Sequence, residues 1–247
     1  MPFITGGYPT LDVTRNLLPA IDSAGADIIE IGIPFSDPIA DGPVIAGSMH
    51  EALLQGATPT ALFDLVRSVR GSLGAGLVAM VSCSIIMRHG LDTFSSKAAD
   101  AGFDGLIVPD LDSSGPNSPA GQLRAACDRH DLTLSLLIAP STTEARIPEL
   151  VACSSGFIYV LARAGITGER DDAPEIQDIV NRVRAHTMLP LAVGFGVSTA
   201  EHVRMVGRSA DAAIVGSALV RRLGQADDPV DAAASFVREL ATGCQRL

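Results

Sequence analysis

The central stretch of the chain is Ile28-Ile29-Glu30-Ile31-Gly32-Ile33-Pro34-Phe35-Ser36-Asp37-Pro38-Ile39-Ala40-Asp41-Gly42-Pro43. The branched aliphatic residues of its first part are typical of a strand that is buried on both faces. Glu30 lies inside this run, where loss of water should raise its pKa and a carboxylate needs a purpose. Alternatively, Glu30 lies at the rim and Asp37 and Asp41 only form turns. For Asp37 alone the turn is the better interpretation, because Ser-Asp-Pro is ordinary turn chemistry.

Similar apolar runs recur along the chain and predict eight strands, at 3–5, 28–33, 77–81, 105–108, 134–138, 157–161, 191–193 and 212–215. Helices are expected at 10–24 with Thr10 as cap, 44–54, from Thr58-Pro59, 90–101, 122–129, 143–151, 175–186, 198–206 with Ser198 as cap, from Gly216-Ser217, and 230–245. This alternation predicts an α/β protein, a (β/α)8 TIM barrel in which residues 1–247 form a single domain. A doubly wound sheet is the alternative, although no Gly-x-Gly-x-x-Gly follows the first strand.

The composition limits the classes of partner. A net charge of −10 argues against a general nucleic-acid surface and against an anionic membrane. The four cysteines are scattered, which is typical of buried free thiols in a reducing compartment. No signal peptide is visible, and no apolar stretch reaches the roughly 20 residues needed to span a bilayer. We therefore expect a cytoplasmic protein that binds neither nucleic acid nor membrane.

Two glycine-rich loops follow the last two expected strands. In a barrel of this kind, phosphate groups often bind at these loops. Gly194-Phe195-Gly196 lets a ligand approach the backbone closely, and Gly216-Ser217 opens a helix whose N–H groups attract anions. The alternative is that both segments are tight turns only. Together they predict a phosphate-binding site.

Catalytic groups of a barrel come from the carboxyl ends of its strands. Glu30, Asp41, Asp110 and Tyr159 are all expected at that end. A buried tyrosine usually needs a partner for its hydroxyl, yet a strand tyrosine is more often a core residue than a catalytic one. The position of Tyr159 at the same end as Glu30 favours a role in the site.

The remaining chemistry is acid–base catalysis by carboxylates. The only lysine, Lys97, lies in the middle of an expected helix and far from a strand end, which argues against a Schiff-base mechanism. The histidines are dispersed, form no metal-binding pattern and are interpreted as surface residues: His50, His89, His130, His186 and His202. The sequence therefore predicts a site without metal.

The segment from Ile31 to Pro43 resembles the hallmark of the tryptophan synthase alpha chain family. Further matches follow in family order along nearly the whole chain, at 3–5, 106–111, 156–159, 165–168, 194–196 and 214–217. The resemblance implies a carbon–carbon lyase of tryptophan biosynthesis, an aromatic amino acid pathway. The implied reaction is the retro-aldol cleavage of indole-3-glycerol phosphate to indole and glyceraldehyde 3-phosphate.

The resemblance also implies the roles of individual residues. Glu30 matches the glutamate that moves protons at the indole carbon and the glycerol hydroxyl, Asp41 the aspartate that stabilises the positive indole nitrogen, and Tyr159 the tyrosine beside the glutamate. The substrate phosphate is expected at Gly168, Gly196, Gly216 and Ser217, and the substrate pocket at Phe3 and Phe195. The loop at 162–174 is a candidate lid. The chain itself needs no cofactor.

In this family the alpha chain works with a PLP-dependent beta chain in an alpha2beta2 heterotetramer, and several departures fall where the two chains meet. Ala46 and Glu51 stand where the family usually has Gln and Arg, and Asp112 replaces a proline. Val81-Ser82-Cys83-Ser84-Ile85 replaces a Met-x-Tyr-x-Asn-Pro-like stretch. The usual first helix is truncated or missing. The leading interpretation is a lyase that works with a beta chain, and a further hypothesis is that its coupling to the beta chain is weakened or lost.

Two rival functions remain. One is a stand-alone lyase that releases free indole. The other is a catalytically weak phosphate-binding scaffold that regulates a partner, against which the presence of both Glu30 and Asp41 argues.

Overall fold

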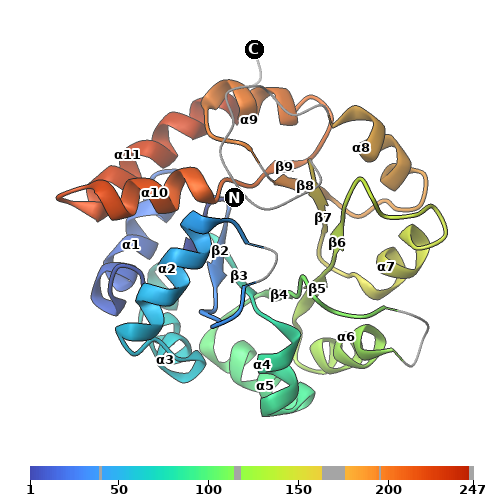
Figure 1. Ribbon diagram of the computed structural model, residues 1–247, viewed down its shortest axis with the longest axis horizontal. Coiled ribbons are helices and arrows are strands. Elements are labelled where there is room, and N and C mark those ends of the chain that lie inside the picture. The colour runs from blue at the N-terminus through green and yellow to red at the C-terminus, as the bar shows by residue number, and fades with distance from the viewer. Residues whose placement is uncertain (39–40, 114–117, 163–175, 195, 245–247) are drawn as a thin grey trace.

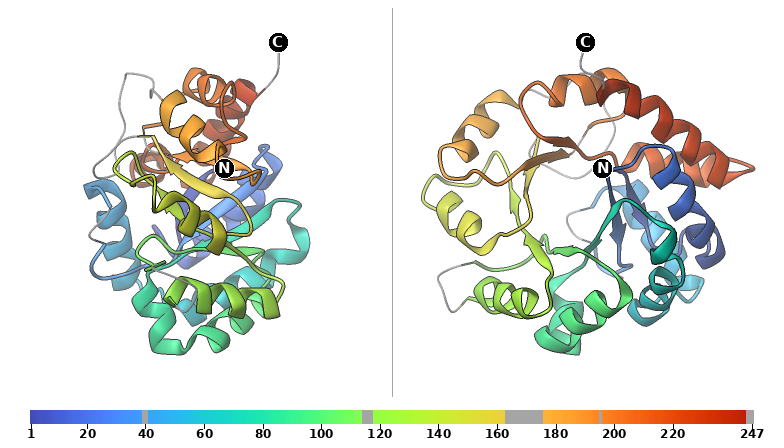
Figure 2. Two further views of the ribbon diagram at one scale, coloured as in Figure 1. Left: turned by 90° about the vertical axis from the view of Figure 1, so that its right-hand side faces the viewer. Right: turned by 180° about the vertical axis from the view of Figure 1, so that it is seen from behind.

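The computed structural model describes residues 1–38, 41–113, 118–162, 176–194 and 196–244. Parallel strands form the centre of the molecule, and helices form a ring around them (Figures 1 and 2). The strands are β1 (Phe3–Thr5), β2 (Ile28–Gly32), β3 (Gly76–Met80), β4 (Gly105–Ile107), β5 (Thr133–Ser135), β6 (Leu137–Ile138), β7 (Ile158–Leu161), β8 (Leu191–Gly194) and β9 (Ala212–Ala213). The helices are α1 (Leu11–Ser23), α2 (Pro43–Leu54), α3 (Pro59–Val69), η1 (Arg70–Ser72), α4 (Cys83–His89), α5 (Leu91–Ala101), α6 (Pro119–Arg129), α7 (Ile147–Cys153), α8 (Gln177–Arg184), α9 (Ala200–Val206), α10 (Ser217–Gln225), α11 (Pro229–Ala241) and η2 (Thr242–Cys244).

The strands close into a barrel at two seams. The order β1-β2-β3-β4-β5 is continuous, as is β6-β7-β8-β9. Leu136 separates β5 from β6, and its carbonyl oxygen accepts a 3.1 Å hydrogen bond from the Tyr159 N–H, which joins the two groups. On the other side, the Phe3 N–H donates to the Val215 carbonyl over 2.9 Å. The TIM barrel predicted from the sequence is therefore confirmed, and the open doubly wound sheet is wrong.

The apolar strands bury both of their faces. Ile4, Ile29, Ile31 and Leu77 are fully buried between the barrel and its helices. A second cluster fills the barrel itself and contains Val78, Ile107, Phe157, Tyr159, Ala192 and Ile214. Each fully buried aliphatic side chain contributes roughly 1.5–3 kcal/mol, so these two layers supply most of the driving force for folding. Within the described residues, no helix has the length and apolar character that a membrane span requires.

Several helix boundaries agree with the sequence predictions and others do not. Thr10 caps α1 as predicted, with its hydroxyl accepting from the Val13 N–H. Ser198 was the wrong cap for α9, because Thr199 accepts from the His202 N–H over 3.1 Å. The helix expected over 143–151 begins only at Ile147, and the helix expected over 230–245 runs over Pro229–Ala241. The strand expected over 134–138 is divided at Leu136, and the one over 212–215 ends at Ala213.

Three other expectations need correction. Helix α4 was not predicted, although Ser82 caps it by accepting from the Ser84 N–H. His202 is a buried residue rather than a surface one, since only 6% of it is exposed. Its ring nitrogen lies within hydrogen-bond distance of the Ser198 N–H. Of the cysteines, Cys127 and Cys153 are buried free thiols, but Cys244 is exposed and Cys83 half-buried.

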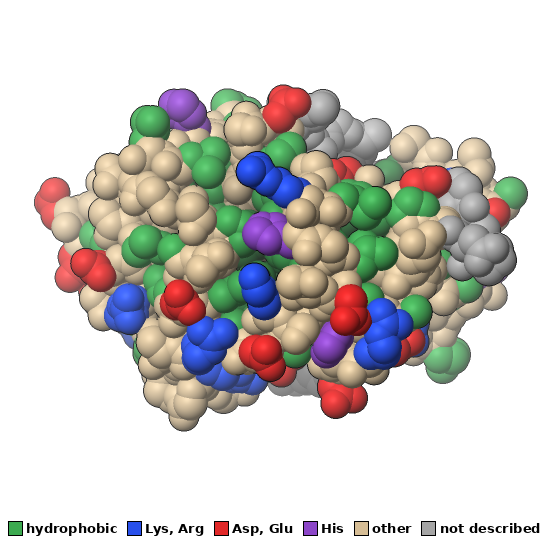
Figure 3. Space-filling model, turned by 90° about the horizontal axis from the view of Figure 1, so that it is seen from below, with side chains coloured by type: hydrophobic (Ala, Val, Ile, Leu, Met, Phe, Trp, Pro, Cys, Tyr) green, Lys and Arg blue, Asp and Glu red, His purple; other side chains and the backbone are tan. Residues whose placement is uncertain are grey.

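Charged side chains of both signs are interspersed on the face formed by α4, α5 and α6 (Figure 3). One ion pair there joins neighbouring helices, with the Arg129 guanidinium 2.9 Å from the Asp92 carboxylate. Both side chains are more than half exposed, so solvent screens the pair and it adds little to stability. The stability of the barrel therefore comes from its apolar layers.

Candidate active site

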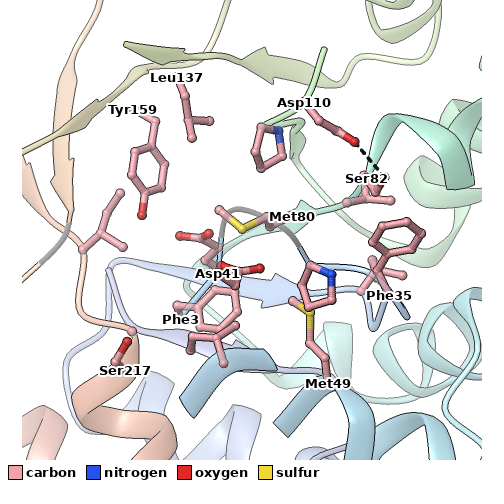
Figure 4. Close-up of a pocket in the computed structure, with 18 of the residues that line it drawn as sticks. Phe3, Phe35, Asp41, Met49, Met80, Ser82, Asp110, Leu137, Tyr159 and Ser217 are labelled. Carbon is pink, nitrogen blue, oxygen red and sulfur yellow. Dashed lines mark hydrogen bonds between the residues drawn. The ribbon is translucent and has the colours of Figure 1, made fainter. Parts of the chain in front are cut away.

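A cavity of about 550 Å³ opens at the carboxyl ends of the strands. Its wall is mostly apolar and includes Phe3, Met49, Met80 and Leu137, which lie around a few polar groups (Figure 4). A volume of this size is typical of a small-molecule site. The cavity contains the residues that the sequence placed at this end of the barrel: Glu30, Asp41, Asp110, Tyr159, Gly196, Gly216 and Ser217.

Glu30 lies in the middle of β2, level with Phe3 on β1 and Val78 on β3. It is completely buried, and both carboxylate oxygens lack a hydrogen-bond partner within the part of the chain that the structure describes. Burial raises the pKa of Glu30 from its ordinary 4.5 to about 8, and the nearby Asp41 adds to the rise. Glu30 therefore carries a proton at neutral pH. The alternative position at the rim of the strand is wrong.

Asp41 comes from the loop between β2 and α2. Its N–H donates to the Pro38 carbonyl over 3.1 Å, and its side chain lies at the cavity (Figure 4). Burial raises the pKa of Asp41 from 3.8 to about 6. The two carboxyl groups therefore differ in charge at pH 7, because Asp41 is mostly ionised while Glu30 is mostly protonated. Such a separation of pKa values is how one site holds an acid and a base.

Tyr159 lies on β7, level with Leu137 on β6 and Ala192 on β8. Only 5% of its surface is exposed, and its hydroxyl points into the cavity toward Asp41 (Figure 4). Burial, together with the charges of Glu30 and Asp41, raises the pKa of Tyr159 well above its ordinary 10. The phenol is therefore neutral and can donate a hydrogen bond inside the cavity.

The two glycine-rich loops also line the cavity. Gly196 has a φ of +82°, a left-handed conformation that favours glycine. Gly216 precedes α10, and Ser217 is the first residue of that helix. The first N–H groups of a helix have no partner within it and attract anions. Gly168 and Phe195, expected for phosphate and for the pocket, lie outside the described residues, as do residues 163–174 of the candidate lid.

Phe3 occupies the place that the sequence predicted, because it lines the cavity. Its ring lies against Gly32, where an added Cβ would approach ring carbon Cζ to 2.7 Å. A residue with a side chain at position 32 would therefore push the ring into the cavity. Gly32 thus defines the wall beside Glu30.

The sequence did not predict the part of the cavity near α4. Ser82 donates to the Asp110 carboxylate over 2.8 Å, and the Cys83 N–H donates to the other oxygen over 2.8 Å. Ser84 also lines the cavity. The Ser82 cap was the signal that could have revealed this arrangement. Asp37 is exposed at the same opening, where it also lines the cavity.

The fold and the site define a class of protein. It is a (β/α)8 barrel with a protonated and an ionised carboxyl group in an apolar pocket that two glycine-rich loops also line. Acid–base chemistry on a small, partly apolar phosphate ester fits this arrangement.

Comparison with known proteins gives the particular family. The family model for the tryptophan synthase alpha chain matches residues 1–246. The tryptophan synthase alpha chain of Chloroflexus aggregans is 41% identical over 251 residues, covering 100% of this chain and 92% of the relative. That of Nitratidesulfovibrio vulgaris is 42% identical, covering 98% and 91%. The chain belongs to the tryptophan synthase alpha chain family.

Solved structures agree. The tryptophan synthase of Mycobacterium tuberculosis superimposes with a TM-score of 0.88 at 34% identity, covering 98% of this chain and 90% of the other. A mutant alpha-subunit from Pyrococcus furiosus gives a TM-score of 0.87 at 33% identity, covering 97% and 96%. The likeness therefore extends over nearly the whole barrel.

Proposed function

We propose that this chain cleaves indole-3-glycerol phosphate to indole and glyceraldehyde 3-phosphate, the reaction of its family. The observation that carries the proposal is Glu30, a fully buried carboxyl group without a partner among the described residues. A buried acid of this kind is costly to keep in a core strand, and its raised pKa suits proton transfer near neutral pH.

The protonated Glu30 starts the reaction by giving its proton to the indole ring carbon that carries the glycerol chain. The ring then becomes a cation and can accept the electron pair of the carbon–carbon bond. The ionised Asp41 stabilises the positive charge that develops at the ring nitrogen. Glu30, now a carboxylate, takes the proton of the adjacent glycerol hydroxyl. The bond breaks, its electrons return to the ring, and indole and an aldehyde are released with Glu30 protonated again.

Tyr159 and the loops hold the substrate around these two groups. The neutral phenol of Tyr159 donates a hydrogen bond beside Glu30 and limits the positions of the glycerol hydroxyl. The phosphate binds at Gly196, Gly216 and Ser217, with N–H groups at the start of α10 supplying the positive potential. Gly168 and Phe195 keep the roles expected from the resemblance. We also propose that residues 1–247 form a single domain.

The partner we propose is a tryptophan synthase beta chain, which would hold the PLP and receive the indole, in an alpha2beta2 heterotetramer in the cytoplasm. The departures from the family pattern support weakened coupling. Two of them, Ser82 and Ser84, lie at the cavity itself. These short side chains leave fewer contacts through which a conformational change at the alpha-chain cavity could reach the active site of the beta chain.

Indole release by the purified chain, with and without a beta subunit, tests these proposals. We expect slow release alone, and a loss of about 10²–10⁴-fold in Glu30→Gln. The exposed Glu239 supplies the control, since Glu239→Gln should retain wild-type turnover. No release in either condition would overturn the proposed reaction. A sharp rise with the beta subunit would establish a coupled alpha chain and overturn the weakened coupling, whereas a response of less than a few-fold would support the weakened coupling.

A further inference from the structure

The cavity has two polar ends that lie across the barrel from each other. One end is formed after β8 and β9 and contains Gly216 and Ser217. The other is formed after β3 and β4 and contains Ser82, Ser84 and Asp110. Figure 4 shows Ser217 and the Ser82–Asp110 pair on opposite sides of Asp41 and Met80. A ligand whose phosphate is held at Ser217 therefore extends toward Ser82 and Ser84.

The hydrogen bonds at this second end fix the direction of every hydroxyl proton. Ser82 has a single hydroxyl proton, and it goes to Asp110 over 2.8 Å. The Ser82 and Ser84 hydroxyl oxygens are 2.9 Å apart, so the proton between them comes from Ser84. The hydroxyl protons of Ser84 and Ser82 are therefore both used in the hydrogen bonds that lead from Ser84 through Ser82 to the Asp110 carboxylate. The lone pairs of Ser84 remain available.

The surroundings add further acceptors. Asp110 lies at this end, and Asp37 also lines the cavity. Among the described residues, no lysine, arginine or histidine lines it. The end wall beyond the reacting groups therefore accepts hydrogen bonds and has no side-chain cation to donate them. A donor on the ligand is satisfied there, whereas an apolar group displaces water from the acceptors without replacing its hydrogen bonds.

We propose that this pocket selects indole-3-glycerol phosphates whose benzene ring carries a hydrogen-bond donor, a hydroxyl group, which binds Ser84 at the β3–β4 end. The inference rests on the proposed function, because that reaction places the phosphate at Ser217 and the reacting carbon at Glu30. With the phosphate and the reacting carbon placed in this way, the benzene ring of the substrate points toward Ser84. Serine side chains are short, so space is left for the substituent.

Steady-state cleavage of matched analogues tests the proposal. Each benzene carbon in turn carries either a hydroxyl or a methyl group, which is similar in size but donates no hydrogen bond. We expect one hydroxyl isomer to exceed its methyl counterpart in kcat/KM by about three- to tenfold, the range of one net hydrogen bond. Ser84→Ala should abolish that preference. Ser36→Ala provides the control, because Ser36 is exposed nearby but does not line the cavity, and the preference should persist.

Calorimetric binding of hydroxyindoles and methylindoles gives a second measurement that needs no turnover. The same isomer should bind more tightly than its methyl counterpart in the wild type, and equally in Ser84→Ala. Cleavage of the unsubstituted substrate without any hydroxyl preference would overturn this inference and leave the proposed function intact. A preference that survives Ser84→Ala would do the same. Failure to cleave the unsubstituted substrate would instead overturn the proposed function.

Discussion

Gly194 lies directly against the hydroxyl of Tyr159, so that a Cβ at position 194 would stand 2.6 Å from the phenolic oxygen. The two residues belong to neighbouring strands, β8 and β7. The missing side chain at position 194 makes the room in which the phenol lies, close enough to Glu30 for its charge to raise the pKa of Tyr159. A glycine that the sequence assigned to a phosphate loop therefore also positions Tyr159, for which we propose a role in the site.

Gly194→Ala should displace the Tyr159 ring and lower activity. Because the clash involves ring atoms and a fully packed barrel, we expect a loss of about 1–3 kcal/mol of stability and of about 10–100-fold in kcat. Thermal unfolding and indole release measure the two effects. The matched control is Gly47→Ala in helix α2, where an added Cβ meets no atom within 4 Å. That variant should gain about 0.5–1 kcal/mol. Equal behaviour of the two variants would contradict the positioning role.

The pH dependence of kcat/KM should be bell-shaped. Asp41 must be ionised, so activity rises as pH increases through about 6. Glu30 must be protonated, so activity falls as pH increases through about 8. The substrate phosphate also titrates near pH 6, which makes the alkaline limb the diagnostic one. A rate that stays level between pH 7 and pH 9.5 would show that the proton of Glu30 is not used.

The stability of the protein should also fall between pH 4.5 and about 8 because of Glu30. Its folded pKa is raised above 4.5, so the folded state binds more protons in this window and loses stability as pH rises. At about 1.4 kcal/mol per unit, the loss reaches up to about 5 kcal/mol. Glu30→Gln removes this dependence. Urea unfolding at pH 4.5 and pH 9 gives the free energy of unfolding of both proteins. Relative to wild type, Glu30→Gln should be more stable at pH 9 than at pH 4.5. The same stability difference at both pH values would contradict the prediction.

Ser217→Ala should weaken phosphate binding without changing the chemical step. The loss of one hydroxyl donor should raise KM and the inhibition constant of glycerol 3-phosphate by about three- to tenfold, with kcat nearly unchanged. Ser235→Ala serves as the control, because Ser235 is an exposed residue of α11. A fall in kcat at constant KM would place Ser217 in the chemistry and not in phosphate binding.

Much of the barrel was predictable because its strands are continuous apolar runs. The strand around Ile29 and Ile31, and the caps Thr10 and Thr58, follow from local chemistry. The helix boundaries that were predicted wrongly depend on competition between neighbouring residues for the capping position. Thr199 caps α9 in place of Ser198, and residues 143–146 precede the helix that Ile147 begins, with a proline in its first turn. A pattern cannot rank two adjacent caps, because the choice is made by packing.

The site residues also divide into those that local sequence predicts and those that only the fold brings together. Glu30, Asp41, Tyr159 and Ser217 were all named from the sequence, and all line one cavity. Burial of His202 was not predictable, because it depends on contacts across the fold. The polar end at Ser82 and Asp110 joins residues that are 28 positions apart. The parallel pairing of β3 with β4 brings them together, so that the Asp110 carboxylate, which follows β4, accepts from the first N–H of α4, which follows β3.

The sequence by itself determined the alternation of strands and helices, the buried carboxyl group and the glycine-rich loops, because hydrophobic period and backbone chemistry are local properties. Only the tertiary structure decided the charge states of Glu30 and Asp41 and the distances between the residues of the site. Closure of the barrel removes water from Glu30 and leaves Asp41 less deeply buried, so their pKa values separate to about 8 and about 6. The difference arises from desolvation, which is a property of the whole packed barrel and of no single segment.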